Sequence, residues 1–283
     1  MIRKPIVAGS FYEAEPNKLD KQIADCFISK FGPGALPLSK GRKRVYGIIA
    51  PHAGYQFSGP CQAWAYKELA EANPAEIYVI IAPNHTSYNG DSIYLADFET
   101  PLGLVNTDTI PVKSLLKSRL IRENEMSHLH EHSIEVQLPF LQFINKGKPY
   151  KILPLIVSAH SYEICRKIGK AIANLKKKLC IIASSDFTHY GPNYGYVPFI
   201  ANKKENMYGI DLKAIELIKK LDAKAFFEYS AYKTICGASA ITTAIEAVKA
   251  MGAEKARLLR YYTSGDIIND YHNAVGYTAM VFE

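Results

Sequence analysis

The stretch Val79-Ile80-Ile81-Ala82-Pro83-Asn84-His85 decides the fold class of this 283-residue chain. It is a short apolar run that ends in polar residues, and similar runs occur at residues 48–52 (IIAPH), 152–158 (ILPLIVS) and 180–186 (CIIASSD). Short runs that are apolar on both faces and rich in β-branched side chains are typical of central strands covered by helices on each side. The pattern therefore predicts four buried strands.

The segments between these runs have the apolar spacing of helices. Pro60 is a good helix-start residue before a helix over residues 62–72. Apolar residues four apart predict a helix over 162–175, and another is expected over 133–144, with Pro139 as a kink. Strands that alternate with helices are typical of an α/β sheet that is at least partly parallel.

The C-terminal third completes the expected domain. Its pattern predicts an acid-capped helix over 211–221, a helix rich in small residues over 237–251, and strands over 256–262 and 274–282. The last strand alternates between polar and apolar residues, so we expect an antiparallel edge with one face toward solvent. Residues 1–283 are thus predicted to form a single α/β domain with a mixed, partly parallel sheet flanked by helices.

Composition excludes several classes of protein. A chain that is 48% hydrophobic and 22% charged is neither disordered nor fibrous. Its net charge of +7 comes from short, scattered basic runs without a nucleic-acid-binding motif, so no nucleic-acid partner is expected. The five cysteines are an odd number without CxxC spacing, and no apolar stretch could span a bilayer. We therefore expect a cytoplasmic protein without a membrane anchor.

Polar residues that could bind a ligand or transfer a proton follow three of the four predicted strands. His52 and His85 each come directly after an apolar run and a proline, and Asp186 is followed three residues later by His189. Ligands of open α/β sheets bind beyond the carboxyl ends of the strands, where these residues would meet. A carboxylate next to an imidazole suits proton transfer near neutral pH.

Cys236 differs from the other cysteines because it directly precedes the helix predicted over 237–251. The N–H groups and the dipole at a helix start favour a thiolate, which is the form of cysteine that binds metals and attacks electrophiles. The remaining cysteines occur inside predicted helices or strands and are expected to be small buried hydrophobic residues: Cys26, Cys61, Cys165 and Cys180.

Residues 128–135 (HLHEHSIE) are rich in histidine. Their alternate spacing is a poor arrangement for several metal ligands, and Ser133 and Glu135 fit capping of the following helix. Glu131 and His132 are better candidates for orienting a metal ligand or contacting a substrate.

At these residues the sequence resembles the Memo family, and the resemblance extends over essentially the whole chain. The motifs that carry it are Ala8–Tyr12, Ala50–Tyr55, Pro83–His85, Glu131–Glu135, Ser184–His189 and Thr234–Gly237. The family is similar in fold to the class III extradiol dioxygenases, non-haem Fe(II) enzymes that open catechol rings with O2. The resemblance thus implies a class III extradiol dioxygenase-like fold.

The resemblance also implies one metal ion held by three residues: His52, His85 and Cys236. Asp186 and His189 would line the same pocket as the catalytic pair, with His189 as the acid–base group. Tyr55, Glu131 and His132 would support the ligands or contact substrate. The dioxygenases use a carboxylate where this chain has Cys236, and because a thiolate also suits Cu(I) and Zn, the expected metal is Fe(II) or copper ahead of zinc.

Three functions follow as hypotheses. The first is a redox protein or dioxygenase-like enzyme that binds iron or copper and acts on a small substrate. The second is an adaptor without catalysis that binds phosphotyrosine peptides or other anions, and the third is a hydrolase with Cys236 as nucleophile and His189 as base. The family resemblance further implies a radical-SAM enzyme and an AMMECR-type protein as partners.

Overall fold

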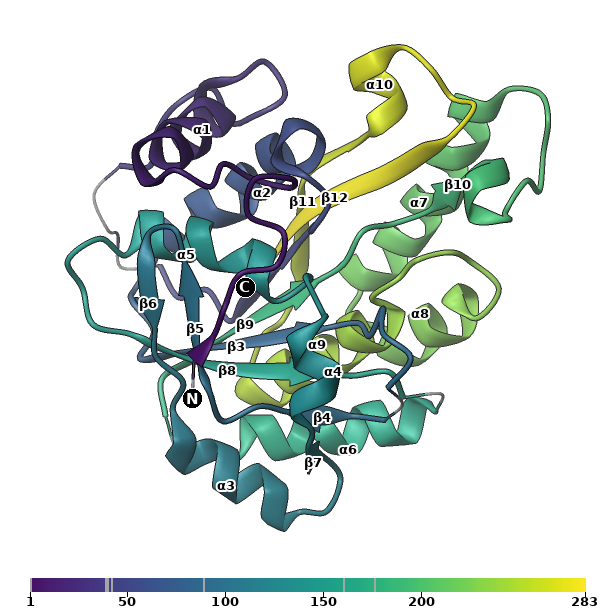
Figure 1. The fold of residues 1–283 in the computed structure, drawn as a ribbon. Helices are drawn as coiled ribbons and strands as arrows, with labels where there is room; N and C mark the ends of the chain where they lie inside the picture. The colour runs from purple at the N-terminus through teal and green to yellow at the C-terminus, as the bar shows by residue number, and fades with distance from the viewer. Residues whose placement is uncertain (1, 39–40, 42, 89, 160, 176) are drawn as a thin grey trace.

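The computed structural model describes residues 2–38, 41, 43–88, 90–159, 161–175 and 177–283 (Figure 1). At the centre of its main sheet, four parallel strands lie in the order β2 (Gly47–Ala50), β9 (Leu179–Ser184), β3 (Ile77–Ala82) and β8 (Lys151–Ile156). These are the four predicted strands, and they are buried except for Lys151 at the start of β8. The prediction of a partly parallel α/β sheet is therefore confirmed.

Antiparallel strands extend the sheet on both sides and make it mixed. Beyond β2 lies β12 (Ala274–Phe282), which also pairs with β11 (Ala256–Thr263) and β10 (His189–Tyr190). Beyond β8 lie β4 (Ser92–Ile93) and β7 (Arg122–Glu123). A smaller separate sheet consists of β1 (Ile2–Arg3), β5 (Asp97–Thr100) and β6 (Gly103–Val105).

The expectation that residues 274–282 form an edge strand facing solvent is wrong. This strand is antiparallel as predicted, but it lies between β2 and β11, and each of its residues is buried. Helix α2 (Tyr55–Ala70) packs against it, and Gly276 lies so close to Asp211 that a Cβ there would clash with the carboxylate. Its polar residues thus face protein, which alternation alone does not reveal.

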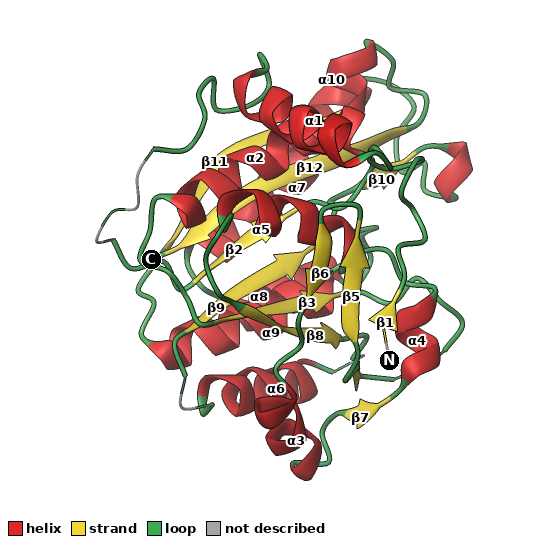
Figure 2. Cartoon of the chain, turned by 60° about the vertical axis from the view of Figure 1, so that its left-hand side comes forward, coloured by secondary structure: helices red, strands yellow, loops and turns green. Residues whose placement is uncertain are grey.

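Helices cover both faces of the main sheet (Figure 2). One face packs against α1 (Pro16–Ile28), α2 and α5 (Leu138–Ile144), and the other against α6 (Tyr162–Ala173), α7 (Lys203–Lys219), α8 (Ala223–Ser230) and α9 (Ala238–Met251). Neighbouring strand residues belong to opposite cores, as Ile80 and Ile81 do. Shorter helices complete the fold: α3 (Thr109–Lys117), α4 (Glu125–Leu129), α10 (Ser264–Ile268), and the 3-10 turns Glu135–Gln137 and Pro192–Tyr194.

Two predicted helices begin earlier than expected. Helix α2 starts at Tyr55 and contains Pro60 in its second turn, where the missing N–H removes only one helical hydrogen bond. Helix α7 starts at Lys203, so Asp211 is not a cap but a buried residue in the middle of the helix. Pro139 lies in the first turn of α5, directly after a 3-10 turn. No helix in the described part of the chain is both long and apolar enough to cross a membrane.

A buried ion pair fastens the N-terminal segment to the histidine-rich segment 128–135. Arg3, which is 1% exposed, forms an ion pair with Glu135 and donates hydrogen bonds to the carbonyls of His128 and Glu131. Glu135 also accepts hydrogen bonds from the hydroxyl of Tyr12 and the backbone N–H groups of Ile6 and Val7. The expectation that Glu135 caps a helix is therefore wrong, because its carboxylate binds residues of the distant N-terminal segment.

Candidate metal centre

His52 follows β2, and its ring is held in one orientation. Its Nδ1 lies 2.8 Å from the hydroxyl oxygen of Ser184, which donates its own proton to the carbonyl of Ser133 at 2.7 Å and accepts a hydrogen bond from Gln137 at 2.9 Å. Because that hydroxyl proton is already used, Nδ1 of His52 must be the donor. The free lone pair is then on Nε2, which lies 3.3 Å from the sulfur of Cys236.

His85 follows β3 and is oriented by Glu131. The Glu131 carboxylate accepts hydrogen bonds from His85 Nδ1 at 3.0 Å, from the backbone N–H of His85 at 2.6 Å and from the N–H of Ser133 at 2.9 Å. Burial raises the pKa of Glu131, but these contacts with His85 outweigh it and hold the pKa at about 2. A carboxylate that accepts from Nδ1 leaves Nε2 free for a metal, as in carboxylate–histidine–metal arrangements.

The surroundings of His85 favour positive charge. Burial lowers its pKa, yet the hydrogen bonds to Cys236 and Glu131 raise the pKa to about 10. The negative groups that hold a proton on this imidazole also attract a metal cation, which binds by displacing that proton.

Replacing Glu131 with glutamine is expected to weaken metal binding about 10- to 100-fold. Glutamine can still accept from His85 Nδ1, but it lacks the negative charge that makes the imidazole a stronger ligand. The dissociation constant would be measured by competition with a chelator. The matched control is Glu123→Gln, because Glu123 is exposed on β7; equal affinity in the two variants would contradict the role given to Glu131.

Cys236 is placed by a close approach between the start of α9 and the end of β9. A Cβ on Gly237 would lie 2.5 Å from Ser185 Cβ and 2.7 Å from Ser184 O, so only glycine fits there. The sulfur of Cys236 accepts a hydrogen bond from the N–H of Asp186 at 3.3 Å. Burial nevertheless raises the pKa of the Cys236 thiol. Burial thus shifts the pKa of Cys236 in the direction opposite to the one that a helix start favours, while the contact with His85 lowers it.

The three expected ligands converge. The ligand atoms of His52, His85 and Cys236 all lie within 4.8 Å of one another. Two imidazole nitrogens and one thiolate sulfur suit iron, copper or zinc and exclude Mg²⁺ and Ca²⁺, which prefer oxygen. The residues present therefore fit a transition metal.

The residues predicted to support the ligands differ in their placement. The ring of His132 stacks on His85 with centroids 4.9 Å apart and meets His52 edge-on at 5.5 Å, and it lines the same cavity. Tyr55 does not line that cavity. Its hydroxyl donates to the carbonyl of Val136, and its ring packs in the core.

His189 and Asp186 also face this cavity. Nδ1 of His189 lies 2.9 Å from two carbonyl oxygens, those of Phe187 and Thr234, so it carries the proton and leaves Nε2 as an acceptor. Asp186 is 4% exposed and accepts a hydrogen bond from the backbone N–H of His52 at 2.8 Å. Burial raises the pKa of Asp186, whereas the charge of His189 lowers it.

The cavity has a volume of about 410 Å³. Besides the predicted residues it is lined by apolar and aromatic side chains, among them Phe57, Tyr194 and Tyr277, none of which had a sequence signal. Tyr194 meets the ring of His189 edge-on at 5.1 Å. Ser184, which anchors His52, does have a recognisable signal, because it is a polar residue at the end of an apolar run.

A buried carboxylate supports the chain next to His189. Asp211 on α7 accepts hydrogen bonds from the hydroxyl of Thr188 at 2.6 Å and from that of Tyr261 at 2.7 Å. Burial dominates over these contacts and raises the pKa of Asp211 to about 6.

The raised pKa of Asp211 predicts a pH-dependent stability. The folded protein holds this proton more tightly than the unfolded chain, so the contribution of Asp211 to the free energy of unfolding rises as the pH falls from about 7 to 4. In the variant Asp211→Asn, the side chain at this position is uncharged over the whole pH range. The stability of the wild type relative to this variant should therefore increase by about 2 to 3 kcal/mol over that range, measured by urea unfolding. A constant difference would contradict this.

Together, the fold and the site define an α/β protein with a candidate His-His-Cys metal centre at the carboxyl ends of its parallel strands. A family model described as "Memo-like protein" matches residues 3–281. The chain belongs to the Memo family.

Relatives cover the entire chain. A MEMO1 family protein of Methanopyrus kandleri is 41% identical, over all of this chain and 99% of its own length. A MEMO1 family protein of Nitrosopumilus maritimus is 40% identical over the full length of both. The crystal structure of an uncharacterised protein from Escherichia coli K12 is similar with a TM-score of 0.53, covering 85% of this chain and all of that one. At 8% sequence identity, this last likeness concerns the fold alone.

Proposed function

We propose that this protein binds one redox-active metal ion, Fe(II) or copper ahead of zinc, and acts as a dioxygenase-like oxidoreductase on a small substrate. The observation that carries the proposal is the fixed orientation of two imidazoles. His52 and His85 each donate Nδ1–H to a buried acceptor, so that both Nε2 atoms are free for a metal beside the sulfur of Cys236.

When bound, the metal would act as a Lewis acid and as an electron carrier. Two histidines and one anionic ligand resemble the facial set of non-haem Fe(II) oxygenases, with thiolate in place of carboxylate. The chain's own residues then bind and orient the substrate. A cavity of about 410 Å³ with aromatic walls suits a single-ring compound.

His189 would move the proton. Its Nε2 can accept a proton from a substrate hydroxyl, while Nδ1–H stays bonded to the carbonyls of Phe187 and Thr234. These two acceptors stabilise the positive charge that the imidazole gains, and Asp186 adds a carboxylate in the same cavity.

Two observations favour this function over the alternatives. The sulfur of Cys236 lies within hydrogen-bond distance of His52, at 3.3 Å, whereas no hydrogen bond between Cys236 and His189 exists in the described residues. This argues against a Cys236–His189 hydrolase. Of the described residues that line the cavity, none is lysine or arginine, and Asp186 is among them, which disfavours phosphotyrosine binding.

The proposal is tested with protein purified without oxygen. Elemental analysis should find about one iron or copper per chain, and oxygen uptake should begin when a catechol from a small panel is added. His189→Gln should keep the metal and lose the uptake, because only proton transfer is removed. Stoichiometric zinc that iron and copper do not displace, or oxygen uptake unchanged in His189→Gln, would overturn the proposal.

A further inference from the structure

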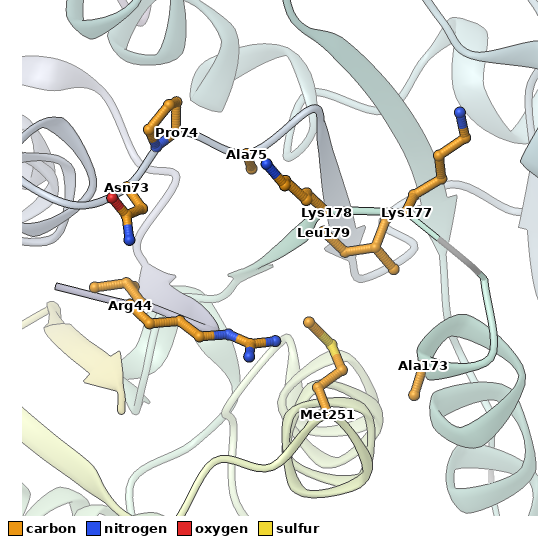
Figure 3. A pocket seen from close by; sticks show the side chains of 10 residues that line it. Arg44, Asn73, Pro74, Ala75, Ala173, Lys177, Lys178, Leu179 and Met251 are labelled. Atoms are coloured by element: carbon orange, nitrogen blue, oxygen red, sulfur yellow. The ribbon is translucent and has the colours of Figure 1, made fainter. Parts of the chain in front are cut away.

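A second cavity lies at the amino ends of the parallel strands, whereas the metal centre lies at their carboxyl ends. Its volume is about 640 Å³, and Figure 3 shows the residues that line it. Its lining residues come from the segments that lead into β2, β3 and β9 and from the C-terminal ends of α6 and α9. Strand β9 runs from Leu179 at this cavity to Ser184 beside His52, so the two sites are about 17 Å apart. The cavity is thus separate from the cavity around His52 and His85.

The floor of this cavity is apolar and its rim is cationic. The apolar part of the lining consists of Val45 and Leu179, which are buried, and Met251, which is partly exposed. Arg44 and Lys178, both exposed, lie at the rim. Figure 3 shows the guanidinium of Arg44 directed toward Met251, and the side chain of Lys178 directed toward Ala75. None of the described residues that line the cavity is acidic.

Within the described part of the chain, the rim cations differ from their neighbours because they form no ion pair. Among the described residues, no salt bridge involves Arg44, Lys177 or Lys178. Nearby, in contrast, Lys43, Lys255 and Arg257 all pair with Glu283. The guanidinium of Arg44 instead lies over the ring of Tyr46, 4.3 Å from its centroid, which steadies its planar fork while leaving its N–H donors available.

We infer that this cavity binds a small organic phosphate with an apolar body. Cationic side chains that form no ion pair create a positive electrostatic potential in a concave surface, and this potential attracts anions. An arginine fork matches phosphate oxygens with two parallel hydrogen bonds, and the neighbouring lysines supply further charge for a dianion. The apolar floor then accommodates the rest of the ligand, and the volume falls within the range of small-molecule sites. This inference does not depend on the proposed metal chemistry.

The probe that tests it is phenyl phosphate, titrated into the full-length protein by calorimetry at low salt. It should bind more tightly than inorganic phosphate, which lacks the apolar body, and than the neutral benzyl alcohol. The double variant Arg44→Gln/Lys178→Gln should weaken binding about 10-fold, because two exposed, charge-assisted contacts with the phosphate are lost. Higher salt should weaken it further.

Two control variants show whether the phosphate binds at this cavity. Lys113→Gln/Lys117→Gln removes the same charge from exposed positions on α3, outside the cavity, and should bind normally. His52→Ala removes a metal ligand and should also bind normally. Loss of binding in either control, unchanged binding in the Arg44/Lys178 double variant, or no measurable binding of phenyl phosphate to the wild type would overturn the inference.

Discussion

Cys236→Ala is expected to weaken metal binding at least about 100-fold, because one of three protein ligands is lost and with it the thiolate charge. The imidazoles of His52 and His85 keep their anchors at Ser184 and Glu131, so two ligands remain in place. Metal content would be measured by equilibrium dialysis under nitrogen followed by elemental analysis, with Fe(II), Cu(I) and Zn(II) in separate experiments.

Cys165→Ala is the matched control for that experiment. Cys165 is a buried cysteine on α6 that packs in the core and does not line the metal cavity, so its loss should leave metal stoichiometry unchanged. If both alanine variants bound metal like the wild type, the assignment of Cys236 as a ligand would be wrong, whatever the identity of the metal.

Arg3→Ala is expected to lower the free energy of unfolding by about 3 to 5 kcal/mol, the usual cost of leaving a buried charge without its partner. Both side chains of the Arg3–Glu135 pair are fully buried, and the same guanidinium donates to the carbonyls of His128 and Glu131. Urea unfolding would measure the effect. The variant should also bind metal more weakly, since Glu131 orients His85.

The neighbouring residue supplies the control. Lys4 pairs with Glu99 at 2.6 Å, but the side chains are 68% and 36% exposed. Lys4→Ala should therefore cost less than about 1 kcal/mol. Similar losses for the two variants would show that burial does not set the strength of these ion pairs.

Much of the site could be predicted from local sequence. His52 and His85 each follow a buried strand, and parallel strands point their carboxyl ends to the same edge, so their proximity follows from topology alone. Cys236 is distinguished from the other cysteines by its place before a helix. The likeness of the motifs around these residues to the Memo family implies that all three are ligands of one metal ion.

Other parts of the site depend on contacts that no local pattern encodes. Glu135 has the sequence context of a helix cap, yet it pairs with Arg3, 132 residues away. Asp211 also has the context of a cap and is instead the buried acceptor for Thr188 and Tyr261. In each case a carboxylate is satisfied by donors from distant segments, and capping rules consider only near neighbours.

What the sequence by itself determined is the class of fold and which polar residues follow its central strands. Short apolar runs must be buried strands, and the polar residues that end them must reach one edge of the sheet. Only the tertiary structure decided how these side chains are oriented and which atoms they contact. The contact between Cys236 and His52 joins residues 184 positions apart, and the Nδ1 protons of His52 and His85 are assigned by Ser184 and Glu131. The physical reason is that periodicity reports which face of an element is buried, whereas hydrogen-bond partners are chosen by the packing of whole elements.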